Sequence, residues 1–200
     1  MLLKLLPSLH PEVLAALTML SPTIVAACWV FWANDQQSPN KVSITIAGMG
    51  CIIHFPWSAM LHIYRAYGKN PQIRTLLYKL DVTFIHVHAI CQGYSWTLML
   101  SPIECAYHGL AICFIWSSNP LLHVEQKRWI DILASVGVLI SSFGLYARSQ
   151  HYYFAALLMW IIALSIHSMK LFGTEFQLWF HLILGGPQYC LMAGLYLSKP

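Results

Sequence analysis

Three short stretches of this sequence carry polar side chains whose types and spacing suit hydrolytic chemistry. Ser58 and His62 lie four residues apart, so a helix places them on one face. Asp81 follows nineteen residues after the histidine, and Gln177 and His181 repeat the four-residue spacing near the C-terminal end. Imidazoles bind zinc, and zinc-bound water is a nucleophile near neutral pH. An aspartate can act as general base and a serine hydroxyl can stabilise an oxyanion, so the set supplies most of the groups of a zinc-dependent hydrolase.

The composition places these groups in a membrane protein. Of the 200 residues, 58% are hydrophobic and 9% are charged, and the mean hydropathy is +0.61. An ordinary soluble domain carries about 25% charged residues. We expect a single membrane domain over residues 1–200, with residues 1–12 as a short cytosolic N-terminal segment. The net charge of +4 is scattered along the chain, which gives no indication of nucleic-acid binding.

The apolar runs predict an all-α fold, a polytopic membrane bundle of seven transmembrane helices. Each helix needs about 20 mainly apolar residues to cross a bilayer. A polar loop is expected over residues 65–74, between the second and third spans. The predicted spans cover approximately residues 13–33, 42–64, 80–100, a fourth run that ends near 118, 129–146, 151–169 and 175–197.

Lysine and arginine are distributed unevenly between the two ends of this predicted bundle. Eight of the eleven lie on the side of the N-terminus, and cytoplasmic loops are enriched in these residues. We therefore expect a cytosolic N-terminus in a multi-pass protein of the endoplasmic reticulum, Golgi or plasma membrane. The same topology places the three polar stretches at similar depth near the cytosolic face. Ionisable groups at such positions are functional candidates, because lipid disfavours them.

The motifs resemble those of a known group of membrane proteins, the CREST superfamily. Ser58-x-x-x-His62, then Lys79-Leu80-Asp81, then a histidine motif in the last span are similar to its pattern of S-x-x-x-H, D and H-x-x-x-H. The group includes the alkaline ceramidases, the progestin and adipoQ receptors and the post-GPI-attachment proteins. The resemblance covers about residues 50–196. The first two motifs are most similar to the receptors, and residues 175–189 are most similar to the ceramidases.

The resemblance implies a seven-helix hydrolase that uses zinc to cleave an amide or ester bond of a lipid, with ceramide-like substrates. It implies that His62 and His181 are zinc ligands. It also implies that Asp81 holds the zinc-bound water and that Ser58 faces the reacting carbonyl. The partner expected from the resemblance is therefore a membrane lipid.

Gln177 departs from this pattern, because it occupies the position of the first histidine of H-x-x-x-H. A carboxamide oxygen is a weaker zinc ligand than an imidazole nitrogen. Three arrangements are open: Gln177 ligates weakly or through a water, His167 near the same end of the sixth span replaces it, or the site holds no metal. The last arrangement would make the protein a non-catalytic relative with a receptor-like or scaffolding role.

Other interpretations of the polar residues stand beside hydrolysis. Asp81 can form an ion pair with Lys79 or with a loop arginine at the membrane interface. The alkaline ceramidases also carry an acidic N-terminal stretch that binds calcium, but Glu12 is the only acid in residues 1–12 here, so we do not expect that feature. Two histidines on facing helices could also be the axial ligands of a haem in an electron-transfer protein. The histidines deepest in the predicted spans are His54, His86, His88 and His108.

Overall fold

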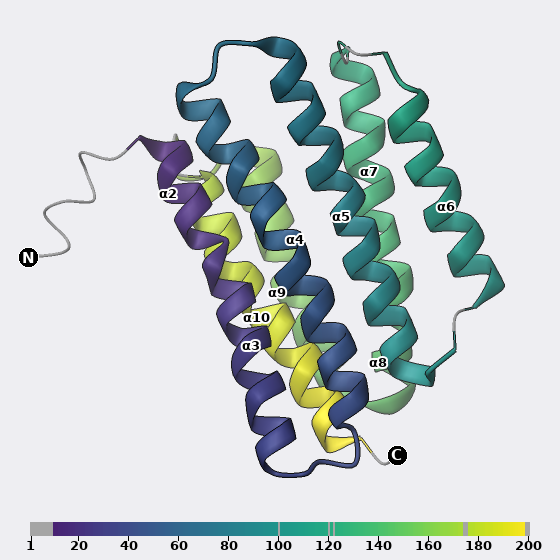
Figure 1. Cartoon of the computed structure of the whole chain (residues 1–200). Helices are drawn as coiled ribbons and strands as arrows, with labels where there is room; N and C mark the ends of the chain where they lie inside the picture. Colours follow the sequence, from purple (N-terminus) through teal and green to yellow (C-terminus); the bar gives the residue numbers. More distant parts are fainter. Residues whose placement is uncertain (1–9, 100, 120, 122, 174–175, 199–200) are drawn as a thin grey trace, which may run out of the picture.

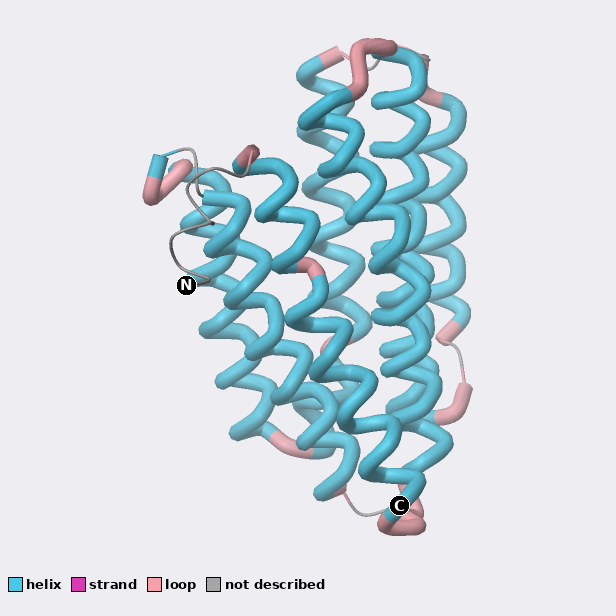
Figure 2. The backbone as a smooth tube through the Cα atoms, turned by 60° about the vertical axis from the view of Figure 1, so that its left-hand side comes forward, coloured by secondary structure: helices cyan, strands magenta, loops and turns pink. Residues whose placement is uncertain are grey.

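The computed structural model describes residues 10–99, 101–119, 121, 123–173 and 176–198. Residues 1–9 of the predicted N-terminal segment and residue 175 at the predicted start of the seventh span lie outside them. The described residues form helices and no β-strand, as Figures 1 and 2 show, which confirms the predicted all-α class. The helices are α2 (Pro11–Thr18), α3 (Leu20–Asp35), α4 (Lys41–Tyr67), α5 (Pro71–Thr97), α6 (Pro102–Ser117), α7 (Val124–Ser141), α8 (Phe143–Arg148), α9 (Gln150–Met169) and α10 (Phe176–Leu197).

Two pairs of consecutive helices continue into one another and form single rods. α2 and α3 join at Met19, which keeps helical dihedral angles (φ −61°, ψ −16°). α7 and α8 join at Ser142, with φ −80° and ψ −10°. The described chain therefore runs up and down as seven helical rods (Figure 1), the number of passes that the sequence predicts.

The rods have the character of an integral membrane protein. Large apolar side chains cover the outside, and Phe31 and Leu110, for example, are 77% and 72% exposed, as expected for a surface that meets lipid. α6 has only 16 residues, fewer than the about 20 of a usual span. Seven complete crossings and a cytosolic N-terminus remain predictions. Four rods are long and apolar enough to cross a membrane: Pro11–Asp35, Lys41–Tyr67, Val124–Arg148 and Gln150–Met169.

α5 begins at Pro71, well before residue 80, where the sequence predicted the third span to start. The side chain of Asn70 caps the helix, because its oxygen accepts hydrogen bonds from the backbone N–H groups of Gln72 (2.9 Å) and Ile73 (3.4 Å). Proline at the first helical position favours the same start. The loop predicted over residues 65–74 is therefore reduced to residues 68–70, and Asp81 lies in the third turn of α5.

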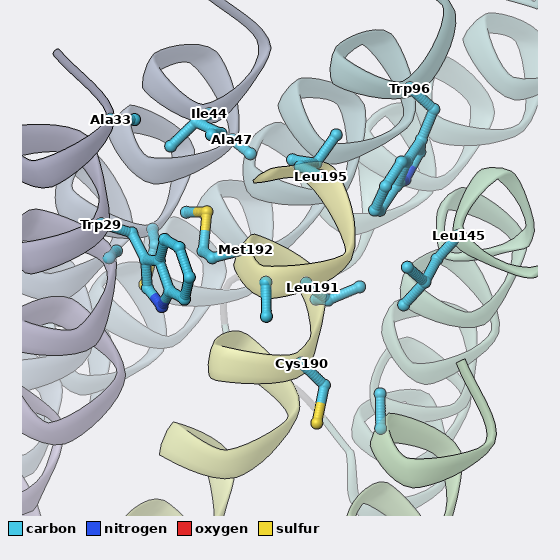
Figure 3. Packing of buried hydrophobic residues seen from close by; sticks show 14 residues of the cluster. Trp29, Ala33, Ile44, Ala47, Trp96, Leu145, Cys190, Leu191, Met192 and Leu195 are labelled. Atoms are coloured by element: carbon cyan, nitrogen blue, oxygen red, sulfur yellow. The ribbon is translucent and has the colours of Figure 1, made fainter. Parts of the chain in front are cut away.

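α10 lies at the centre of the main hydrophobic core. Its residues Cys190–Leu195 are all buried, and they belong to a cluster with side chains of α3, α4, α5, α8 and α9. Figure 3 shows Met192 on the side of Trp29, and Leu195 on the side of Trp96. A stretch of helix that is apolar all round, as Cys190–Leu195 is, is buried in this way. Because α10 is held in the core, the positions of its first two turns, which carry Gln177 and His181, are fixed as well.

Two glycines let neighbouring helices of the bundle approach each other closely. A Cβ atom on Gly48 would collide with Val30, and one on Gly194 would collide with Leu145, so glycine permits close helix packing at both positions.

The C-terminal end of α10 is bound by Asn40, whose Nδ2 donates to the carbonyl oxygens of Leu195 (2.8 Å) and Ser198 (2.7 Å). These bonds satisfy carbonyls that a helix C-terminus leaves unpaired.

Candidate active site

α4 carries three polar side chains at four-residue intervals: His54, Ser58 and His62. With 3.6 residues per turn, the three lie on one face of the helix. Ser58 is 3% exposed and His62 is 4% exposed, and all three residues line an internal cavity. The sequence predicted Ser58 and His62 as site residues, whereas His54 extends the same row by one turn and was not among them.

Asp81 on α5 binds the first of these histidines. A hydrogen bond of 2.9 Å joins Nε2 of His54 to Oδ1 of Asp81. The alternative ion pair with Lys79 is not formed, because the Lys79 ammonium donates to the carbonyl oxygen of Ser118 at 2.8 Å. An aspartate that holds an imidazole fixes its orientation, and such a pair can accept and return a proton.

α10 brings His181 and Gln177 to the same cavity. The rings of His62 and His181 face each other edge to face, with centroids 4.9 Å apart and an interplanar angle of 80°. Nδ1 of His181 and Oε1 of Gln177 are buried, and neither has a hydrogen-bond partner among the described residues. Buried polar atoms are normally paired, so these two atoms are free to receive a ligand, an ion or a water.

Glu12, on the first turn of α2, is a site residue that the sequence analysis missed. Its Oε2 atom lies 2.7 Å from Nδ1 of His62, a contact between residues fifty positions apart. A carboxylate on one ring nitrogen fixes the tautomer of a histidine and leaves the other nitrogen available, as is usual for metal ligands. No short-range pattern in the sequence indicates this contact.

One cavity of about 280 Å³ unites the predicted site residues. Apolar side chains complete its walls, among them Ile85 on α5, Trp160 and Leu164 on α9 and Leu184 on α10. A concave space with apolar walls and a few convergent polar groups is typical of a small-molecule site. The predicted residues that line it are Ser58, His62, Asp81, His167, Gln177 and His181.

His167, the possible substitute for Gln177, lies near the end of α9. The centroid of its ring lies 5.0 Å from that of Phe180 and 5.5 Å from that of Phe176. The aromatic neighbours of His167 are thus phenylalanines, whereas the neighbour of His62 is His181. A role of His167 as third ligand remains a prediction.

A catalytic zinc ion needs about three protein donor atoms around one point. The described part of the chain contains no group of three or more His, Cys, Asp or Glu side chains that could hold a metal ion. Two imidazoles nevertheless face each other, those of His62 and His181, and the unpartnered oxygen of Gln177 is a third donor of another type. Glu12 contacts Nδ1 of His62, so Nε2 of His62 is left for a metal. These are the three donors, two imidazole nitrogens and one weaker amide oxygen, that a zinc ion at this site would use.

His86 and His108 form a second polar cluster, between α5, α6 and α7. Their Nδ1 atoms are 2.9 Å apart, and Nε2 of His108 lies 3.1 Å from Oγ of Ser141. The direct contact leaves no space for an iron porphyrin between the two rings, so this pair does not supply the haem ligands that the sequence allowed. His54, another of the four deep histidines, contacts Asp81 through Nε2.

No protein-family model, no curated protein and no solved structure matches this chain. Its function therefore has to be inferred from the residues that line the cavity and from the chemistry that they allow.

Proposed function

We propose that this protein is a zinc-dependent intramembrane hydrolase that cleaves an amide or ester bond of a lipid. One observation carries the proposal: a single cavity combines histidine, aspartate and serine side chains with apolar walls. A lipid can present its carbonyl group to the polar residues while its acyl chain lies against the apolar ones. The resemblance to the CREST superfamily supports the same class of reaction.

His62, His181 and Gln177 would hold the zinc ion. When bound, zinc supplies a Lewis acid that polarises a carbonyl and activates water. Glu12 maintains the orientation of His62 through Nδ1, because the carboxylate accepts the ring proton. The closeness of the two imidazole rings means that small movements of α10 relative to α4 would change the donor geometry.

Asp81 and His54 provide the proton transfer. Their hydrogen bond of 2.9 Å holds the imidazole in place, and the pair accepts a proton from the attacking water and returns it to the leaving amine or alcohol. Ser58 lies one turn of α4 from both His54 and His62. From there its hydroxyl donates a hydrogen bond to the substrate carbonyl oxygen as negative charge develops on it.

The lipid enters from the bilayer between α7 and α9. Both helices line the cavity, for example through Val138 on α7 and Trp160 on α9. The main neighbours of α7 are nevertheless α5 and α6, and those of α9 are α10 and α8. Leu158 on α9 is 59% exposed, so the outer surface of α9 is apolar there and meets the acyl chains of the membrane.

The experiment is an assay of purified protein for zinc content and for release of fatty acid from a ceramide and from a diacylglycerol. We expect roughly one zinc ion per chain, as in other catalytic zinc sites, and hydrolysis of at least one of the two substrates. His62→Ala and His181→Ala should lose both properties. His151→Ala is the matched control, because this histidine is exposed and does not line the cavity. Zinc-free protein that hydrolyses neither substrate would remove the proposal.

A non-catalytic protein with a receptor-like or scaffolding role is the second candidate, and Gln177 favours it. In the described residues the facing imidazoles are two rather than three, and no His, Cys, Asp or Glu completes the set. On this alternative the unmodified protein binds no zinc, and Gln177→His creates a zinc site because it restores an imidazole four residues before His181. Tight zinc binding by the unmodified protein would contradict it.

A further inference from the structure

A polar hollow of about 370 Å³ lies where α4 ends and α5 and α7 begin. Three of its lining residues, Arg65, Tyr78 and Lys127, also line the cavity that holds the histidines. The hollow is therefore the mouth of that cavity at one end of the bundle. Its remaining lining residues are Glu12, Arg74 and Thr75.

Three cations surround the hollow, and each is placed by a different helix. Arg65 is in the last turn of α4, and Arg74 and Lys127 are the fourth residues of α5 and α7. The Lys127 ammonium lies over the Tyr78 ring, 5.1 Å from its centroid, which directs it toward the hollow. The starts of α5 and α7 add partial positive charge from the helix dipole.

Among the described residues no carboxylate forms a direct ion pair with these three cations, although Glu12 also lines the hollow. The ion pairs among the described residues are those of His54 and His62 with Asp81 and Glu12, and neither includes a lysine or an arginine. Each carboxylate of the hollow and the cavity is hydrogen-bonded to another side chain: Glu12 to His62, Asp81 to His54 and Asp131 to Tyr78.

We propose that the hollow binds the phosphate group of a membrane phospholipid whose acyl chains extend into the cavity. Arginine and lysine are the residues that bind phosphate, through charge-assisted hydrogen bonds. The mouth is continuous with an apolar cavity, so a phosphate that carries acyl chains gains contacts that a free phosphate ion lacks. That this phospholipid is also the hydrolysed substrate rests on the proposed function, whereas the binding does not.

Binding to purified, delipidated protein is measured by native mass spectrometry with three probes. Dioctanoyl phosphatidic acid carries both phosphate and acyl chains, dioctanoylglycerol carries only the chains, and inorganic phosphate carries only the anion. We expect phosphatidic acid to bind at least tenfold more tightly than either of the others, because each cation near a phosphate adds appreciable affinity.

The double variant Arg65→Gln with Lys127→Gln should lose about tenfold or more in affinity for phosphatidic acid. Its unchanged binding of dioctanoylglycerol will show that the cavity is still folded. Arg128→Gln is the matched control, since Arg128 adjoins Lys127 in sequence, is exposed and lines neither space. An equal loss in this control would assign the preference to general surface charge and overturn the proposal.

Two further results would also overturn it. Equal affinity of the unmodified protein for phosphatidic acid and dioctanoylglycerol would exclude a phosphate site, and displacement of the lipid by inorganic phosphate at similar concentration would assign the hollow to a free anion. Bound phosphatidic acid that is never hydrolysed would support this site and count against the hydrolase. Hydrolysis of neutral lipids without any preference for phosphate would support the hydrolase and count against this site.

Discussion

Two pairs of buried histidines in this protein differ in what surrounds them. His62 and His181 line a cavity. Each pair has one ring nitrogen without a partner among the described residues, Nδ1 of His181 and Nε2 of His86. His86 and His108 are 0% exposed, contact each other directly, and pass a further hydrogen bond to Ser141. The first pair is open to a ligand, whereas the second joins α5, α6 and α7 through side-chain hydrogen bonds.

The surroundings of the second pair are closely packed. A Cβ atom on Gly137 would lie 2.9 Å from Cε1 of His108, so α7 approaches α6 to within contact distance at this point. Polar side chains that hydrogen bond across helices are common in membrane proteins and contribute modestly to stability. A buried histidine in a membrane helix therefore indicates a ligand site only when it also faces an open space.

We expect the largest effect from Asp81→Asn, which changes a residue of the cavity that His62 and His181 also line. The change keeps the shape of the side chain but removes the charge that orients His54 and that accepts the proton in the proposed mechanism. We expect fatty-acid release to fall by roughly 10²- to 10⁴-fold, measured per folded molecule after size-exclusion chromatography. Activity within a factor of two of the unmodified protein would place Asp81 outside the chemistry and remove the contrast between the two pairs.

Glu12→Gln should have the next largest effect, on metal binding. The amide no longer holds the ring of His62 as a carboxylate does, and loss of such a supporting group lowers metal affinity or activity about 10- to 100-fold. Competition with a chelator measures the affinity for zinc. Glu125→Gln, at an exposed position on α7, is the control that should leave it unchanged.

His108→Leu tests the closed pair and should affect stability rather than activity. It leaves His86 and Ser141 without their partner, and buried polar groups without a partner cost about 1–3 kcal/mol. Thermal unfolding in detergent should show a lower midpoint, while hydrolysis per folded molecule stays within a factor of two. A large loss of hydrolysis in correctly folded protein would show that the second pair also takes part in function.

The smallest expected effect is that of Ser141→Ala. It removes the hydroxyl that contacts His108 but keeps the backbone carbonyl that accepts from Nε1 of Trp96 at 3.2 Å. Side-chain hydrogen bonds between membrane helices contribute about 0.6 kcal/mol on average. Denaturant titration should therefore detect a small loss of stability, and a loss above 2 kcal/mol would show that the three residues act as one network.

The sequence predicts several residues that line the cavity, because their spacing along one helix follows the helical repeat. Ser58 and His62 share a helical face by spacing alone, and His54 could have been included on the same ground, since it precedes Ser58 by four residues. The all-α class follows from the long apolar runs. These features depend on helix periodicity and composition, which a single sequence displays directly.

The sequence does not show in this way which helices, separated along the chain, are in contact. Glu12 reaches His62 because α2 packs against α4, and Asp81 reaches His54 because α5 begins at Pro71 and runs beside α4. The early start of α5 depends on the cap from Asn70, which the polar composition of residues 65–74 obscures. Which helices become neighbours is set by packing across the whole bundle, and a single sequence does not reveal it.

The central position of α10 has a consequence for biosynthesis. α10 follows the other described helices along the chain, yet its residues Cys190–Leu195 fill the middle of the core. Until α10 has been translated, the preceding helices expose the surfaces that α10 later covers, together with the polar face of α4. These surfaces therefore have no packing partner until α10 is inserted. Chains truncated before residue 176 should accordingly be degraded rapidly in a pulse-chase experiment, and a stable truncated chain would contradict this order of assembly.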